Sequence, residues 1–163
     1  MAAREIMTIQ IRDGIDLDFD EIDRNTNTPR TRIGWDDALA ALEAVDPRAA
    51  HEEVWHRSSG WWKLEPGRAI RCDLAIVIDP NKIVRCVAHI DGVIKGGDYR
   101  LDRIQLLGSV AGPEYDPWYG KLVQRNASKN PIAYIDEQAV LLPKDVMADT
   151  TVIYEDKRKT TSR

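Results

Sequence analysis

The residues of this 163-residue chain that are best suited to binding chemistry lie in the segment Arg57-Ser58-Ser59-Gly60-Trp61-Trp62. Indole rings offer flat apolar faces on which a planar ligand such as a nucleic-acid base can stack. Because Trp61 and Trp62 are adjacent, an extended backbone would turn one toward the core and the other toward a cleft. Arg57 and Ser59 lie on the predicted loop just before them, and loops on rigid scaffolds often carry function. Ser58 and Ser59 are equally suited to capping the helix end or a turn.

Three residues elsewhere in the chain are further candidates for ligand contact, and each has a structural alternative. Arg85 lies on the more polar face of a predicted strand, from which its guanidinium could contact a phosphate. Asn130 precedes Pro131, which places its side chain well for a turn hydrogen bond, and this structural role is favoured. Tyr134 lies on a short predicted strand and suits a pocket wall as well as the core. The predicted ligand-binding set is therefore Arg57, Ser59, Trp61, Trp62, Arg85, Asn130 and Tyr134.

Known catalytic and metal-binding motifs do not fit this sequence. His51 and His56 are five residues apart, roughly 140° around a helix, whereas a zinc protease motif needs histidines four apart on one face. The aspartates of residues 16–23 lack the glycine and final glutamate of a calcium loop. Ser58-Ser59-Gly60 lacks the leading glycine of a nucleophile elbow, and no phosphate-binding glycine pattern occurs. The sequence therefore predicts a non-catalytic binding module with no metal and no cofactor.

Length and composition predict a single soluble domain. No apolar run approaches the roughly 18 residues of a membrane span, and the first five residues contain no apolar signal core. We therefore expect a cytoplasmic location and no membrane partner. Cys72 and Cys86 are expected on paired strands, where a disulfide is geometrically conceivable, but a cytoplasmic setting favours free buried thiols.

The net charge of −4 is unevenly distributed along the chain. Residues 1–56 carry −7, residues 57–135 carry +4 and residues 136–163 carry −1. A basic middle segment is compatible with a nucleic-acid-binding face and also with an ordinary solvated surface. Residues 12–33, acidic and then polar, are predicted to form a loop or an extended arm.

The main structural element that would position these residues is a hairpin over residues 73–90. Its first arm, Leu74–Ile78, has five consecutive apolar residues and suits a strand covered on both faces. Asp79-Pro80-Asn81-Lys82 is a turn, and residues 83–90 form the second arm, with Val84, Cys86, Ala88 and Ile90 on one face. We expect the first arm to begin at Arg68.

The remaining pattern predicts an α+β fold with two helices before this hairpin. Asp46 and Pro47 have the positions of an N-cap and a first helical residue. The predicted elements are strands at residues 5–11, 99–108 and 132–135, helices at 35–45 and 47–57, and a short helix at 121–125. A mixed or antiparallel sheet that closes into a small barrel is expected. Residues 1–156 would form one domain, followed by a disordered tail at 157–163.

Four sequence pieces, in this order, resemble the PUA-like superfamily of PUA, ASCH, EVE, YTH and SRA domains, here in the form of a small bacterial or phage-associated protein. They are Arg57-x-x-Gly60-Trp61-Trp62-Lys63-Leu64, Ile83-Val84-Arg85, Arg103-Ile104-Gln105-Leu106-Leu107-Gly108 and Asn130-Pro131-Ile132-Ala133-Tyr134-Ile135. The third piece has Leu106 where the family pattern has an aromatic residue. The resemblance covers about residues 54–136, and the implied PUA-like core extends to about residue 142.

The resemblance implies recognition of RNA or DNA, often through one flipped or modified base held in an aromatic pocket. A polar group would then read the edge of that base. Some members of the superfamily lie beside nuclease domains in defence systems, so a nuclease or another protein is an implied partner. The alternative is a protein–protein interaction or accessory module of a phage or defence system, with residues 12–33 as its contact surface.

Overall fold

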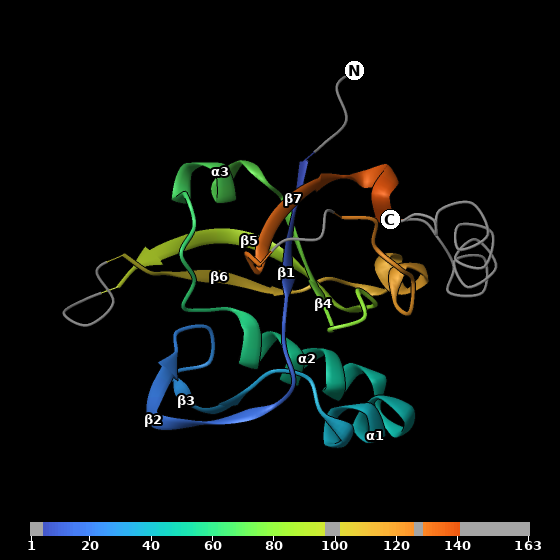
Figure 1. Ribbon diagram of the computed structural model, residues 1–163, viewed down its shortest axis with the longest axis horizontal. Helices are drawn as coiled ribbons and strands as arrows, with labels where there is room; N and C mark the ends of the chain where they lie inside the picture. Colours follow the sequence, from blue (N-terminus) through green and yellow to red (C-terminus); the bar gives the residue numbers. More distant parts are fainter. Residues whose placement is uncertain (1–4, 97–101, 126–128, 141–163) are drawn as a thin grey trace, which may run out of the picture.

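A mixed five-stranded sheet forms the centre of the computed structural model, which describes residues 5–96, 102–125 and 129–140. The strand order is β6-β5-β4-β1-β7 (Figure 1). The strands are β1 (Glu5–Gln10), β4 (Leu74–Ile78), β5 (Val84–Lys95), β6 (Ile104–Val110) and β7 (Ile132–Asp136). The β1–β4 pair is parallel, and the other pairs are antiparallel. The α+β prediction is confirmed. The edge strands β6 and β7 are not paired with each other in the described part of the chain, so closure into a barrel stays a prediction.

Strand β4 is buried on both faces, as its five apolar residues predicted. Ala75 and Val77 pack into one apolar cluster, together with side chains of helices α1 (Asp37–Val45) and α2 (Pro47–Ser58). Leu74, Ile76 and Ile78 pack into a second cluster on the opposite face. The aromatic residues of the 3-10 helix η1 (Pro113–Trp118) cover that second cluster. The sheet is therefore the shared wall between two halves of the core.

The two predicted helices are confirmed, and their caps explain where they begin. The Asp36 carboxylate accepts a hydrogen bond from the Leu39 amide and caps α1. The Asp46 carboxylate accepts one from the Ala49 amide, and Pro47 follows as the first residue of α2. Both carboxylates satisfy amides that would otherwise lack a partner in the first helical turn.

The predicted β4–β5 hairpin is also confirmed, with one change in its register. Asp79 forms the turn, since its carbonyl accepts from the Lys82 amide at 2.9 Å and its carboxylate accepts from the Ile83 amide at 3.1 Å. The pairing shifts by one residue after Val77. As a result Val84 packs in the cluster opposite to that of Cys86, and the prediction that they share a face is wrong.

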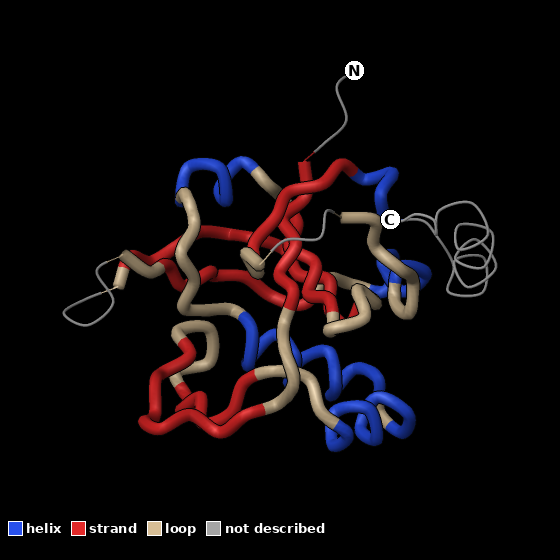
Figure 2. The backbone as a smooth tube through the Cα atoms, in the orientation of Figure 1, coloured by secondary structure: helices blue, strands red, loops and turns tan. Residues whose placement is uncertain are grey.

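Residues 12–33 form a second, two-stranded sheet, so the prediction of a loop or extended arm is wrong. The strands are β2 (Ile15–Asp23) and β3 (Thr28–Ile33), which pair antiparallel. Figure 2 shows this hairpin apart from the main sheet and beside the helices. Residues 15–20 form a strand and not a loop because Ile15, Leu17 and Phe19 alternate with aspartates. This alternation suits a strand with one apolar and one solvated face.

Two further predictions are wrong. The stretch before β4 is helix α3 (Pro66–Arg71), so three helices precede the hairpin and its first arm does not begin at Arg68. The Glu65 carboxylate caps α3 by accepting from the Gly67 and Arg68 amides. Residues 121–125 are not helical, because Leu122 and Val123 bond to the backbone at the β4–β5 turn instead.

The predicted strand at 132–135 is confirmed as β7, and η2 (Glu137–Val140) follows it. Strand β6 confirms part of the predicted strand at 99–108. Residues 99–101 and the predicted tail at 157–163 lie outside the described residues. No described helix combines the length and the apolarity that crossing a membrane would need.

Candidate functional site

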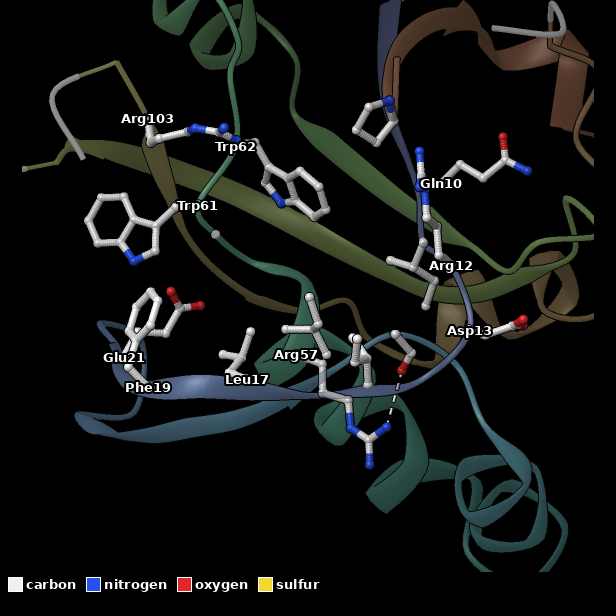
Figure 3. Close-up of a pocket in the computed structure, with 16 residues that line it drawn as sticks. Gln10, Arg12, Asp13, Leu17, Phe19, Glu21, Arg57, Trp61, Trp62 and Arg103 are labelled. Atoms are coloured by element: carbon white, nitrogen blue, oxygen red, sulfur yellow. Dashed lines mark hydrogen bonds between the residues drawn. The ribbon is translucent and has the colours of Figure 1, made fainter. Parts of the chain in front are cut away.

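A cleft of about 340 Å3 lies between the β2–β3 hairpin and the main sheet (Figure 3). Most of its lining is apolar. The apolar side chains come from the ends of β1 and β3, from β2, from the segment after α2 and from a turn before β7: Ile11, Ile15, Leu17, Phe19, Ile33, Trp61, Trp62 and Pro131. Segments far apart in the sequence therefore meet in one apolar hollow.

Trp62 is held in place by its own backbone and ring. Its backbone exchanges two hydrogen bonds with Ile104, at 2.9 and 2.8 Å, and its indole nitrogen donates to the Ser58 carbonyl at 2.7 Å. Trp61 also lines the cleft, and the peptide bond before it is cis. Gly60 lies so close to Gln105 that a Cβ would be 2.7 Å from the amide oxygen of that residue. The two tryptophans therefore follow a backbone segment that is tightly packed against β6.

The wall formed by β2 contains residues that the sequence prediction missed. Leu17 and Phe19 rise from β2 on the side of the cleft, and Phe19 lies at the same end as Trp61 (Figure 3). Phe19 is 60% exposed, which is unusual for a large apolar side chain. The alternation of apolar and acidic residues over positions 15–20 is the sequence feature from which this side of the cleft could have been predicted.

Arg12 and Arg103 supply positive charge at the cleft. Arg12 is exposed, and no carboxylate among residues 5–96, 102–125 and 129–140 forms an ion pair with it. Arg103 has a long contact of 3.8 Å with Asp102. Asp13 lines the cleft too, whereas the Glu21 carboxylate accepts a hydrogen bond from Arg30 at 2.8 Å. Among the described lining residues, the charged groups most open to a ligand are therefore Arg12, Arg103 and Asp13, since Glu21 and Arg57 bond within the protein.

Arg57, a predicted ligand contact, lines the cleft but is already bonded within the protein. Its guanidinium donates to the Glu53 carboxylate at 2.8 Å, to the Asp36 carboxylate at 2.9 Å and to the Gly34 carbonyl at 3.1 Å. The side chain is buried. These bonds tie α2 to the cap of α1 and to the end of β3, so the structure gives Arg57 a scaffolding role.

Ser59, another predicted ligand contact, is fully buried in a polar network beneath the β2–β3 hairpin. The Arg30 guanidinium, also fully buried, donates to the Ser59 hydroxyl at 2.9 Å, to the Gln105 amide oxygen at 3.2 Å and to the His56 carbonyl at 2.7 Å. Gln105 in turn donates to the Ser59 hydroxyl at 2.9 Å. This network joins β3, α2 and β6, and it holds the hairpin that forms the cleft wall.

His56 joins the same hairpin to α2 through both of its ring nitrogens. Nδ1 lies 2.7 Å from the Asp23 carboxylate and Nε2 lies 3.1 Å from the Pro29 carbonyl. Since both partners are acceptors, both nitrogens donate only when the imidazole carries a positive charge, and this geometry therefore favours the charged form. The hydrogen bond to Asp23 raises the pKa of His56. Burial raises the pKa of Asp23, but hydrogen bonds from His56 and from the Asn25 amide outweigh burial and lower it.

A second hollow of about 390 Å3 adjoins the cleft. Asn130 lines it, and the Asn130 carboxamide oxygen accepts from the Ile132 amide at 2.9 Å, which confirms the predicted turn hydrogen bond. Lys129 and Pro80 also line this hollow. Asn130 is therefore close to the cleft but not in it.

The other two predicted contacts lie away from both hollows. Arg85 pairs with Glu43 at 2.6 Å and with Asp79 at 3.0 Å. The Tyr134 ring lies 3.9 Å beneath the Arg68 guanidinium and packs against the core. The structure thus brings Arg57, Trp61 and Trp62 together, with Asn130 next to them, and leaves Ser59, Arg85 and Tyr134 outside.

Within the described ranges, no group of three or more His, Cys, Asp and Glu side chains is arranged to hold a metal ion. Cys72 and Cys86 are both buried and free. Comparison of the chain with models of protein families, with curated proteins and with solved structures gives no match.

Proposed function

We propose that this chain is a non-catalytic binding module that recognises nucleic acid or a nucleotide in the cleft. The observation that carries the proposal is that Trp61, Trp62 and Phe19 line the same cleft as Arg103, which lies near them, and Arg12, which lies farther along (Figure 3). A base has a π-face that stacks on aromatic side chains, and its phosphate is attracted by arginine. An apolar hollow with a few charged groups suits a ligand that has both parts.

The size of the cleft supports a single nucleotide as the unit that is recognised. Its volume of about 340 Å3 is at the lower end of small-molecule sites, which span about 300–1,000 Å3. A base pair inside a duplex could not enter such a hollow, so the ligand would be a single strand of RNA or DNA, or a flipped or modified base. Stacking against an aromatic side chain contributes about 1–3 kcal/mol per base.

The PUA-like architecture belongs to the same proposal. The bridge between Trp62 and Ile104 adds a short piece of chain to the β6 side of the sheet, and a sheet that is extended on this side is compatible with a pseudo-barrel. A reader of this kind would act in the cytoplasm, alone or beside a nuclease.

Fluorescence titration at low salt tests the proposal, because phosphate contacts are strongest there. The probes are short single-stranded RNA and DNA, with and without modified bases. Replacing Trp61 or Phe19 by alanine is expected to weaken binding about 5- to 150-fold, from the loss of stacking. Ile70→Ala is the matched control, since Ile70 is a similarly exposed apolar residue that does not line the cleft. Absence of binding at low salt would refute the proposal.

A protein–protein contact through β2 is the second candidate function. Three of the five large apolar side chains that are most exposed in the described part of the chain lie on β2, namely Ile15, Phe19 and Ile22. Exposed apolar groups gathered on one element are typical of a contact surface. Ile22 does not line the cleft, so Ile22→Ser would abolish a protein contact and leave nucleotide binding intact. A pull-down from the native host in which Ile22→Ser changes nothing argues against this candidate.

A further inference from the structure

The cleft and the second hollow are two parts of one groove. Both are lined by Gln10, Ile11, Arg12, Asp13 and Pro131. The two parts differ in chemistry: the cleft holds the aromatic side chains, whereas the second hollow adds Pro80, Lys129 and Asn130. A ligand that extends from one part into the other must pass these shared residues.

Arg12 lies at the junction on a backbone that is held from several sides. The Gln10 amide donates to the Pro131 carbonyl at 2.8 Å, and the Ile11 amide donates to the Ile78 carbonyl at 2.9 Å. The Arg12 carbonyl accepts from the Trp35 amide at 2.9 Å. The Arg12 side chain extends from the end of β1 along the side of the groove, far from the Trp61 end (Figure 3). A fixed backbone with an exposed guanidinium is well suited to meet an anion in the groove.

Charged side chains lie at both ends of the groove. Lys129 in the second hollow is exposed, and among the residues that the structure describes it forms no ion pair, like Arg12. At the aromatic end, the carboxylate of Glu21 takes part in the buried network with Arg30. Arg12 and Lys129 supply two positive charges at their end against the carboxylate of Asp13, so an anionic group of a ligand is favoured there. At the Trp61 end, Arg103 lies beside the aromatic side chains, which favour a planar group (Figure 3).

We propose that the groove binds a nucleotide in a fixed direction, with the base against Trp61 and Phe19 and the phosphate on Arg12 and Lys129. This inference rests on the proposed function and specifies its ligand: a phosphorylated nucleoside, either free or within a single strand, and not a free base or nucleoside. A phosphate oxygen would accept hydrogen bonds from the Arg12 guanidinium, which is a strong charge-assisted contact. The Lys129 ammonium would add a second positive charge.

Calorimetric titration with matched ligands tests the inference. The probes are the four ribonucleosides, their 5′- and 3′-monophosphates, inorganic phosphate and single-stranded trinucleotides. For the base that binds, we expect one of its monophosphates to bind about tenfold or more tightly than the nucleoside. Arg12→Gln should bring that ratio close to one and leave the nucleoside affinity unchanged, with a smaller effect of Lys129→Gln. Arg71→Gln is the control, since Arg71 is an exposed arginine of α3 that lines neither part of the groove.

The salt dependence gives an independent measure. Each lost phosphate contact should reduce the slope of log K against log salt concentration by about 0.7–1. If trinucleotides bind more tightly than monophosphates and depend on Arg12 in the same way, the phosphate comes from a nucleic-acid strand. If trinucleotides and monophosphates bind with equal affinity, it comes from a free nucleotide.

Four results would overturn the inference. Equal affinities for nucleosides and monophosphates, or a ratio that Arg12→Gln does not change, would exclude the phosphate contact while leaving a base-binding cleft in place. Inorganic phosphate that binds as tightly as the monophosphates would exclude a role for the base. If neither nucleosides, monophosphates nor trinucleotides bind, the proposed function itself is wrong.

Discussion

Replacement of His56 by glutamine is expected to change how the stability of the protein depends on pH. His56 donates to the Asp23 carboxylate and to the Pro29 carbonyl, and the Asp23 side chain is fully buried. A hydrogen bond between charged groups contributes about 1.5–3 kcal/mol. Because the His56 side chain is only 19% exposed, we expect His56→Gln to lower the free energy of unfolding at pH 5.5 by about that amount, 1.5–3 kcal/mol.

The sign of the pH effect follows from the raised pKa of His56. In the unfolded chain the pKa of histidine is about 6.5. The charged contact therefore contributes fully below that pH, and its contribution is lost as the pH rises through the pKa of the folded state. Each pKa unit of difference between the two states corresponds to about 1.4 kcal/mol. The gap between wild type and His56→Gln is thus expected to be largest near pH 5.5 and to narrow toward pH 8.5.

Urea unfolding at a series of pH values measures this gap, and titratable groups that do not interact with His56 cancel in the difference. This matters for His51, whose pKa is lowered by burial and which affects stability with the opposite sign. The Asp23→Asn variant completes a double-mutant cycle that isolates the His56–Asp23 coupling. Hydrogen exchange should also show faster opening of β2 and β3 in His56→Gln. A gap that stays constant from pH 5.5 to pH 8.5, or a coupling energy of zero, would refute the charged double contact.

Three further predictions concern groups that are packed closely against their neighbours. Arg30→Met should lower the free energy of unfolding by about 3–5 kcal/mol, because it leaves buried partners without their cation. Arg24→Met is the control, since Arg24 is an exposed residue of the same hairpin. Equal effects of the two substitutions would contradict the buried network. Gly108→Ala should destabilise by about 1–3 kcal/mol in thermal unfolding, because its Cβ would overlap a neighbouring carbonyl; an unchanged melting temperature would contradict this packing. Cys72 and Cys86 should not react with a chromogenic disulfide reagent at pH 8 until the protein unfolds, because both thiols are buried and burial raises the pKa of Cys72 to about 11. Rapid reaction of the native protein would contradict this prediction and show that the thiols are accessible.

The parts of the fold that the sequence predicted correctly are those that local chemistry decides. Five apolar residues followed by Asp79 and Pro80 are enough for a buried strand and its turn, because both depend on residues close together in the chain. The start of α2 follows in the same way from Asp46, whose carboxylate caps the Ala49 amide. The start of α1 was predicted two residues early, at Trp35, because Asp36 caps this helix and does not lie in its first turn.

The β2–β3 hairpin could not be predicted with the same ease, because its stability depends on distant residues. Its acidic composition suggested a solvated arm. In the structure, Arg30 bonds across to His56, Ser59 and Gln105, and these contacts hold the hairpin on the body of the protein. Ser59 illustrates the same limit, since its position next to Gly60 suggested a ligand contact and its bonding partners are far away in sequence.

The sequence by itself determined the local elements and the residue types available for binding: the β4–β5 hairpin, the capped helices and the pair Trp61 and Trp62. Only the tertiary structure decided which of these residues meet. It placed Phe19 at the same end of the cleft as Trp61 and Arg12 in the same hollow as Lys129, while it paired Arg85 with Glu43. The physical reason is that caps and turns arise within a few residues, whereas the lining of a cleft depends on how strands and helices that are distant in sequence pack together.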